Sequence, residues 1–106
     1  ASLSYSSELS KVAQAKAEDM AANNYFSHTS PTYGSPFDMM KQFGITYTAA
    51  GENIAKGQKT PESVMNAWMN SQGHRENILN SNYEKIGVGY TTDSKGNTYW
   101  VQMFIR

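Results

Sequence analysis

Two histidines and one glutamate are the residues of this sequence best suited to chemistry. His28, Glu52 and His74 each lie in a short segment punctuated by Gly or Pro, and the chain has no other histidine. Two neutral imidazoles and a carboxylate are a suitable ligand set for Zn²⁺ or another divalent cation, and three protein ligands with an open fourth position can activate water. The spacing gives no support by itself, since the histidines are too far apart for a helical His-Glu-x-x-His signature. A metal site on these residues depends wholly on the fold.

The same residues allow interpretations without a metal. Glu52 could orient one histidine by a hydrogen bond, and that histidine would then act as a base with Ser71 or Ser30 as the nucleophile. No nucleophile elbow or oxyanion loop is recognisable to support covalent hydrolysis. A purely structural interpretation has the histidines covering helix ends and Glu52 accepting hydrogen bonds from loop amides. The residues alone leave all of these open.

Helical periodicity indicates what positions His28. Apolar residues recur at three- and four-residue steps over 6–24, which predicts an amphipathic helix. His28 then opens the irregular loop that follows this helix. A second short helix is predicted at about 36–43, with Phe37 and Met40 facing inward.

Glu52 and His74 belong to later elements. Segment 45–57 lacks helical period and is predicted to be an extended strand that carries Glu52. A helix is predicted to start at 60–62, where Thr caps, Pro fits the first turn and Glu meets the helix dipole. Gly73 is expected to end that helix in the left-handed conformation, so that His74 opens the next turn. That turn is expected to carry Ile78 and Leu79 inward.

The last two predicted strands, about 86–90 and 98–105, indicate the architecture. In the final strand Trp100 and Phe104 point one way and Val101, Met103 and Ile105 the other, so both faces are apolar and both need a covering helix. We therefore expect an α+β fold, an α-β-α sandwich with about three antiparallel strands between helical layers. Residues 1–106 are expected to form a single domain.

Glycines in the first of these strands add a detail of packing. Gly87 and Gly89 fall on one face of segment 86–90 and leave room for another element to approach its backbone closely.

Charge and composition narrow the class of partner. Nine basic and nine acidic residues give a formal net charge of zero, so no electrostatic footprint for nucleic acid or an anionic membrane is present. The absence of cysteine removes disulfides, thiolate zinc sites and cysteine nucleophiles. No apolar run approaches the roughly 20 residues of a membrane span. With charged residues at only 17%, the hydroxyl- and amide-rich composition favours an extracellular location.

Four motifs, in order along the chain, carry a family resemblance. They are Ser27-His28-Thr29-Ser30-Pro31, Gly51-Glu52-Asn53-Ile54-Ala55, Trp68-Met69-Asn70-Ser71 and Gly73-His74-Arg75-Glu76-Asn77-Ile78-Leu79. Together they resemble the CAP superfamily, which groups cysteine-rich secretory proteins, antigen 5 and plant pathogenesis-related proteins, and in particular its cysteine-free bacterial branch of SCP-like extracellular proteins. The resemblance implies an α-β-α sandwich, secretion or surface display, and a central cleft lined by two histidines and acidic residues.

Carried over to this sequence, the resemblance implies a ligand cleft made of six residues: His28, Glu52, Asn53, Ser71, His74 and Asn77. Metal ligands would be His28 and His74, with Glu52 as the third. In eukaryotic members the position of Ser71 is a glutamate that supplies a second acid, so the site here is at most a triad. Members also usually begin with a helix upstream of the one near Ser6, and this chain is expected to lack it.

Three functions follow as hypotheses. The first, which we favour, is a secreted module that binds a small ligand, a lipid or a divalent metal ion in the cleft. The sequence leaves enzyme activity open and favours a role without it. The second is a metal-dependent, peptidase-like hydrolase. The third is a module that binds cell-envelope components by protein–protein contact, with a vestigial cleft. The sequence sets neither the ligand nor the oligomeric state.

Overall fold

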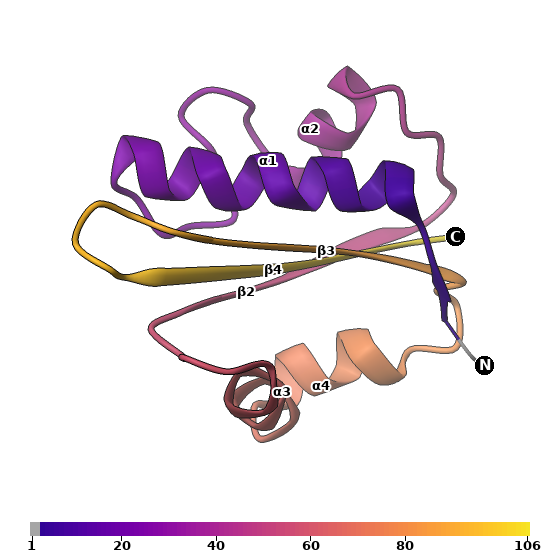
Figure 1. Cartoon of the computed structure of the whole chain (residues 1–106). Coiled ribbons are helices and arrows are strands. Elements are labelled where there is room, and N and C mark those ends of the chain that lie inside the picture. The colour runs from indigo at the N-terminus through magenta and orange to yellow at the C-terminus, as the bar shows by residue number, and fades with distance from the viewer. Residues whose placement is uncertain (1–2) are drawn as a thin grey trace.

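The computed structural model describes residues 3–106, which form four helices and a four-stranded sheet (Figure 1). In chain order the elements are β1 (Ser4–Tyr5), α1 (Ser7–Asn23), α2 (Pro36–Gln42), β2 (Ala50–Lys56), α3 (Pro61–Met69), α4 (Gln72–Leu79), β3 (Lys85–Thr92) and β4 (Thr98–Ile105). Helices α1 and α2 lie over one face of the sheet, and α3 and α4 lie over the other (Figure 1). The predicted α-β-α sandwich is confirmed.

The sheet has one strand more than the sequence predicts. Its order is β1-β3-β4-β2, with β4 antiparallel to both β3 and β2. The additional strand, β1, pairs in parallel with the start of β3, and at two residues it is too short to show a period. Strand β2 begins at Ala50 rather than at Ile45, because its pairing with β4 ends where Ala50 meets Ile105.

The larger core lies between α1 and the sheet. Ser6 caps α1 by accepting a hydrogen bond from the Leu9 amide at 3.1 Å, and the apolar stripe of the helix packs on β3 and β4. A Cβ atom on Gly87 or Gly89 would stand only 2.4 Å from the backbone of Leu9 or Ala13, respectively. The predicted close approach to these glycines is confirmed, and it seats α1 directly on β3.

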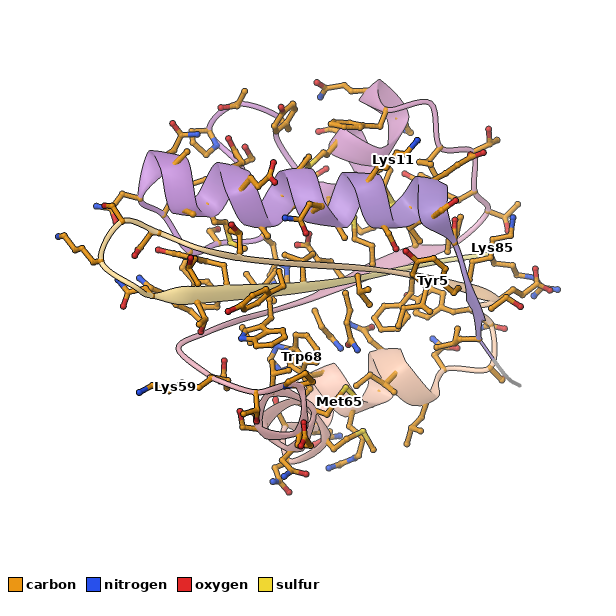
Figure 2. All side chains as sticks on the ribbon, in the orientation of Figure 1. Tyr5, Lys11, Lys59, Met65, Trp68 and Lys85 are labelled. Carbon is orange, nitrogen blue, oxygen red and sulfur yellow. The ribbon has the colours of Figure 1, made fainter. Side chains whose placement is uncertain are left out.

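The core beneath the sheet is smaller. Val64 and Trp68 of α3 pack with Ala55, and Figure 2 shows Trp68 between α3 and the sheet. In α4 only a partly buried face meets the sheet, so the predicted inward position of Ile78 holds. Leu79 is 64% exposed and the prediction for it is wrong, because it lies about 100° further round the helix than Ile78.

The short helix α2 corrects a second predicted core position. Pro36, Met39 and Met40 are buried, at the three- and four-residue steps of a single helical face. Phe37 follows Pro36 and is therefore rotated off this face, which leaves it 44% exposed instead of inward as predicted.

Candidate functional site

Glu52 and His28 form a pair in which the acid is buried and the base is exposed. Glu52 lies in the middle of β2, opposite Met103 of β4, and its side chain is 1% exposed. His28 comes from the loop after α1, and its Nδ1 lies 2.8 Å from Glu52 Oε1 while its side chain is 54% exposed. A carboxylate placed in this way fixes the orientation of the imidazole and leaves Nε2 as its outward atom.

A buried lysine forms a hydrogen bond with the backbone of the histidine in this pair. Lys16 is 1% exposed, and its Nζ donates a hydrogen bond of 2.8 Å to the backbone oxygen of His28. Burial lowers the pKa of Lys16, against the charges of Glu52 and Asp19, which raise it. Sequence reasoning missed this residue, although Lys16 falls on the apolar face of the predicted helix, where a charge needs an explanation.

Asp19 is the centre of the hydrogen bonds that hold the His28 loop. It accepts hydrogen bonds from Asn23 Nδ2 at 2.6 Å, from Ser30 Oγ at 2.6 Å and from the hydroxyl of Tyr25. Burial alone raises the pKa of the Asp19 carboxyl, but these hydrogen bonds and the charge of Lys16 lower it below its ordinary value. The Ser30 hydroxyl, a candidate nucleophile, is 3% exposed and committed to this network.

His74 lies within α4 and not ahead of it as predicted. Ser71 is the N-cap residue, in an extended conformation, so α4 starts at Gln72 and includes Gly73 as an ordinary helical residue. The expected left-handed Gly73 is therefore wrong, because the break between α3 and α4 falls at Asn70 and Ser71 instead. His74 thus occupies the first turn of α4, on its partly buried face.

The ring of His74 is held by Ser71, with Nδ1 2.9 Å from the Ser71 hydroxyl oxygen. Burial lowers the pKa of His74, and the neighbouring charge of His28 lowers it further. The imidazole is therefore favoured in its neutral form, the form that ligates metals and accepts protons.

Asn53 and Asn77 tie α4 to β2. Asn53 is fully buried, and its Nδ2 donates to the backbone oxygen of His74 at 3.0 Å and to Gln102 Oε1 at 3.1 Å. Asn77 Nδ2 donates to Asn53 Oδ1 at 2.9 Å and to the backbone oxygen of Glu52 at 3.2 Å. These bonds place the backbone of His74 beside the strand that carries Glu52.

The arrangement offers two imidazoles and one incomplete carboxylate. In residues 3–106 the hydrogen bonds of both rings involve Nδ1, and Glu52 Oε2 is buried without a hydrogen-bond partner. No three His, Asp or Glu side chains in this part of the chain are grouped so as to hold a metal ion together. Glu52 therefore orients one of the two histidines, and the metal site stays a prediction.

A comparison with the models of known protein families gives one match that covers nearly the whole chain. The model of the CAP family, described as the cysteine-rich secretory protein family, matches residues 1–104. The chain belongs to the CAP family. With no cysteine in its sequence, it falls in the cysteine-free bacterial branch that the motifs resemble.

Relatives of this CAP chain include bacterial proteins of greater length. The YkwD protein of Bacillus subtilis is 66% identical over 97 residues, which are 92% of this chain and 37% of YkwD. An extracellular protein of Bacillus anthracis that contains an SCP domain has a solved structure that matches with a TM-score of 0.88 and 36% identity. The match covers 98% of this chain and 33% of that protein. The chain thus spans about a third of the length of these relatives.

A second similar structure is that of an outer surface protein of Borrelia burgdorferi. It matches with a TM-score of 0.90 and 25% identity over the whole of this chain and 78% of its own. Within residues 3–106, no helix has the length and apolar character needed to cross a bilayer. The prediction that residues 1–106 form a single CAP domain that lacks the first helix of the family stays a prediction.

Proposed function

We propose that this CAP domain is a binding module of an extracellular protein and that its site binds a divalent transition-metal ion, with Zn²⁺ as the first candidate. The observation that carries the proposal is the 2.8 Å contact between His28 Nδ1 and the buried Glu52 Oε1. Ligating histidines commonly donate their second ring N–H to a carboxylate in this way. Nε2 of His28 and Nε2 of His74 are the proposed ligand atoms.

Charge and protonation support the proposal. The lowered pKa of His74 keeps its imidazole available as a neutral ligand near pH 7. Oε2 of Glu52, which has no partner among the described residues, leaves carboxylate charge beside the His28 ring, and Lys16 compensates only from the buried side. With two protein ligands, we expect the site to bind Zn²⁺ with moderate affinity. Water or a group from another molecule would complete the coordination of the metal ion.

The test is the melting temperature with and without Zn²⁺. Binding to the folded state alone stabilises it by about 2.7 kcal/mol at a hundredfold excess over Kd. We expect a rise of several degrees at pH 7.5 that grows with the logarithm of the Zn²⁺ concentration above Kd and is lost in His28→Gln and in His74→Gln. Glu52→Gln should weaken binding by about tenfold to a hundredfold, because the carboxylate orients its ligand. The sequence contains no third histidine that could obscure the result.

Two controls accompany this measurement. Mg²⁺, which prefers oxygen ligands, should give no shift. The Zn²⁺ shift should be the same in the wild type and in Glu8→Gln, which changes an exposed acid outside the site. Absence of a shift at millimolar Zn²⁺ would refute the proposal. A shift of equal size in all variants would place the metal elsewhere.

A serine hydrolase is the second candidate, favoured by the 2.9 Å contact between Ser71 Oγ and His74 Nδ1. In that mechanism His74 would take the proton of the Ser71 hydroxyl. The carboxylate of the site bonds His28 rather than His74, so no acid orients this base. Turnover of a peptide or ester library that Ser71→Ala abolishes, with Zn²⁺ absent, would favour this candidate over the first.

The extracellular assignment has its own support. One similar protein is described as extracellular and another as an outer surface protein. A module that contacts cell-envelope components through its surface predicts that envelope binding survives His28→Gln and His74→Gln. Retention of envelope binding together with absence of a Zn²⁺ shift would therefore replace the metal proposal with the envelope one.

A further inference from the structure

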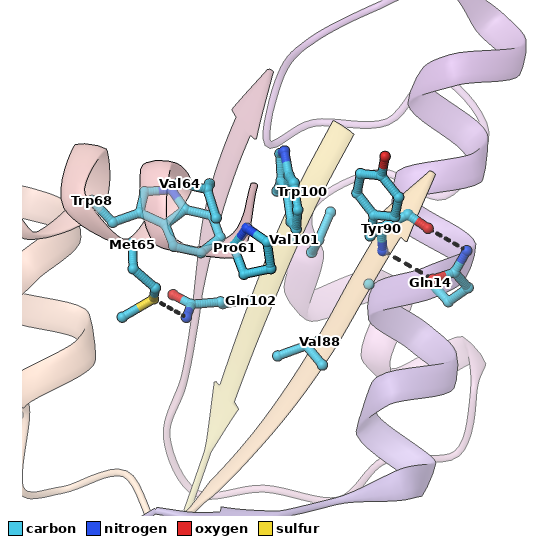
Figure 3. Close-up of a pocket in the computed structure, with 11 residues that line it drawn as sticks. Gln14, Pro61, Val64, Met65, Trp68, Val88, Tyr90, Trp100, Val101 and Gln102 are labelled. Atoms are coloured by element: carbon cyan, nitrogen blue, oxygen red, sulfur yellow. Dashed lines mark hydrogen bonds between the residues drawn. The ribbon is translucent and has the colours of Figure 1, made fainter. Parts of the chain in front are cut away.

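Two buried side-chain oxygens in residues 3–106 lack a hydrogen-bond partner, and Oε2 of Glu52 is the one that belongs to an acid. Figure 3 shows the opposite case at Gln14, whose amide is satisfied at both ends by the backbone of Tyr90. A buried carboxylate is stable only where donors or a positive charge compensate for its lost hydration. Glu52 therefore needs a compensating group in addition to the single contact with His28.

The ring of His28 is poorly placed to be that group. It lies 2.8 Å from Glu52 Oε1, but 54% of the side chain is exposed, and solvent screens a charge in such a position. A histidine also carries a charge only when both ring nitrogens are protonated, and Nε2 then has no lone pair for a metal ion. Compensation by the His28 ring would therefore exclude a metal ion from it.

Lys16 is the one basic side chain that is buried in residues 3–106. Its Nζ donates a hydrogen bond of 2.8 Å to the backbone oxygen of His28, the residue whose ring contacts Glu52. An ammonium group has three hydrogens, and in the described residues this is the one hydrogen bond that Nζ donates. Burial lowers the pKa of Lys16, and of the two acids that oppose this shift Glu52 has a larger effect than Asp19.

The second buried acid, Asp19, has donors of its own. Its carboxylate accepts hydrogen bonds from Asn23, from Ser30 and from the hydroxyl of Tyr25. Both of its oxygens therefore have partners, whereas Oε2 of Glu52 has none among the described residues. Of the two acids, Glu52 is the one that depends more on a charge at a distance.

We propose that Lys16 is the counter-charge of Glu52 and, through this acid, a positioning residue for His28. The lysine acts through the protein interior, and the carboxylate stays available to accept a hydrogen bond from Nδ1 of the half-exposed ring. The ring need not carry the compensating charge, and its Nε2 stays open. The charge pair is a property of the fold and stands without a metal ion, whereas its effect on the ligand ring rests on the proposed function.

Melting temperatures test the charge pair. Lys16→Met and Glu52→Gln each leave a buried charge without its partner, so each should lower the melting temperature of the wild type by about 10 °C or more. Adding Glu52→Gln to Lys16→Met should instead raise the melting temperature by at least about 5 °C, because the uncompensated acid is removed. A lysine that only filled space or tethered the loop would give no such reversal of sign.

The reversal can be read even where one variant does not fold. A folded double variant beside an unfolded Lys16→Met chain would support the charge pair. A double variant no more stable than Lys16→Met would overturn it.

Two controls identify the partners. Lys11→Met removes an exposed lysine of the same helix, and Glu52→Gln should lower the melting temperature as much in that chain as in the wild type. Asp19→Asn added to Lys16→Met should raise the melting temperature less than Glu52→Gln does, because Asn keeps the hydrogen bonds of Asp19 only in part. A larger rise with Asp19→Asn would overturn the proposal, since Asp19 would then be the partner of Lys16.

Calorimetric titration with Zn²⁺ tests the positioning role. Lys16→Met should weaken Zn²⁺ binding by about tenfold to a hundredfold, as Glu52→Gln does, and should not weaken it further in a chain that already carries Glu52→Gln. Additive losses would overturn the positioning role, because Lys16 would then not act through Glu52. A wild type that binds no Zn²⁺ would refute the proposed function instead, and the melting temperatures would still decide the charge pair.

Discussion

At the residue scale, the candidate site depends on charges buried behind it. Lys16 and Asp19 are both on α1 and both buried, and they hold the loop of His28 through a backbone oxygen and through Ser30. The exposed imidazole thereby gains a defined position without being packed itself. Removal of one member of such a buried group leaves an unpaired charge, which costs more than the group contributes as a whole.

Asp19→Asn should lower the free energy of unfolding by about 2–4 kcal/mol at pH 7, because Lys16 stays buried without its acid and three hydrogen bonds weaken. The pKa of Asp19 is lowered in the folded state, so its contribution is complete above the ordinary value of 3.8 and is lost as the pH falls below it. Urea unfolding from pH 7 to pH 2 checks this: the variant and the wild type should converge at low pH. Glu76→Gln, at an exposed position, is the control and should change little.

His74 gives the fold a second pH dependence. Burial, and to a smaller extent the charge of His28, lower the pKa of His74 below 6.5. As the pH falls below that value, the unfolded state takes up a proton more readily than the folded state, and the free energy of unfolding decreases. We expect His74→Gln to lose less stability than the wild type between pH 7.5 and pH 5.5. Thermal unfolding at both pH values measures it, and an equal loss in the two proteins would contradict the assignment.

At the element scale, the edges of the sheet are closed by side chains of the helices and loops around it. The outward carbonyl groups of β2 accept hydrogen bonds from three side chains: Tyr83 OH to Ala50, Asn77 Nδ2 to Glu52 and Trp68 Nε1 to Ile54. At the opposite side, Gln14 of α1 bonds both the N–H and the C=O of Tyr90 in β3. Each helix layer therefore satisfies backbone groups that an open edge would expose.

The seat of α1 on β3 leads to a prediction for two glycines. Gly89→Ala should destabilise the fold by about 3 kcal/mol, because its Cβ would stand 2.4 Å from the backbone of Ala13 and the helix would have to move. Gly73→Ala is the matched control, since nothing lies within 4 Å of its Cβ and the residue is helical. That change should be neutral or stabilising by up to about 1 kcal/mol. Equal effects in denaturant unfolding would contradict the packing.

At the scale of the whole molecule, the two layers differ in how much they bury. Among residues 3–106, the core between α1 and the sheet holds twelve buried residues, whereas the core under the sheet holds three. Helix α4 buries none completely, and its N-cap residue Ser71 makes no capping hydrogen bond. Within residues 3–106, the lower layer, which carries His74, is therefore the less stable side of the sandwich.

Native-state hydrogen exchange should reveal this difference. We expect the amides of α4 to exchange at least on the order of tenfold faster than those of α1, because local opening of α4 exposes little apolar surface. Uniform protection across both helices would show instead that the sandwich opens only as one unit.

Local patterns in the sequence were enough to define the elements and most of their faces. The apolar stripe of α1, the Thr60 cap of α3 and the two apolar faces of β4 follow from local periodicity and capping, which do not depend on distant residues. The four motifs also predict the family that the match of the CAP model over residues 1–104 confirms. The predictions for Leu79 and Gly73 are wrong because both residues lie near element ends, where a displacement by one residue changes the face or the helix to which a side chain belongs.

Only the tertiary structure decides which side chains contact one another. In the tertiary structure Glu52 contacts His28 and not both histidines, and Lys16 donates a hydrogen bond to the backbone oxygen of His28. Strand β1 pairs with β3 and extends the sheet. These are contacts between residues distant in the chain, and periodicity carries no information about them, because it reports which face of an element is buried and not what covers that face.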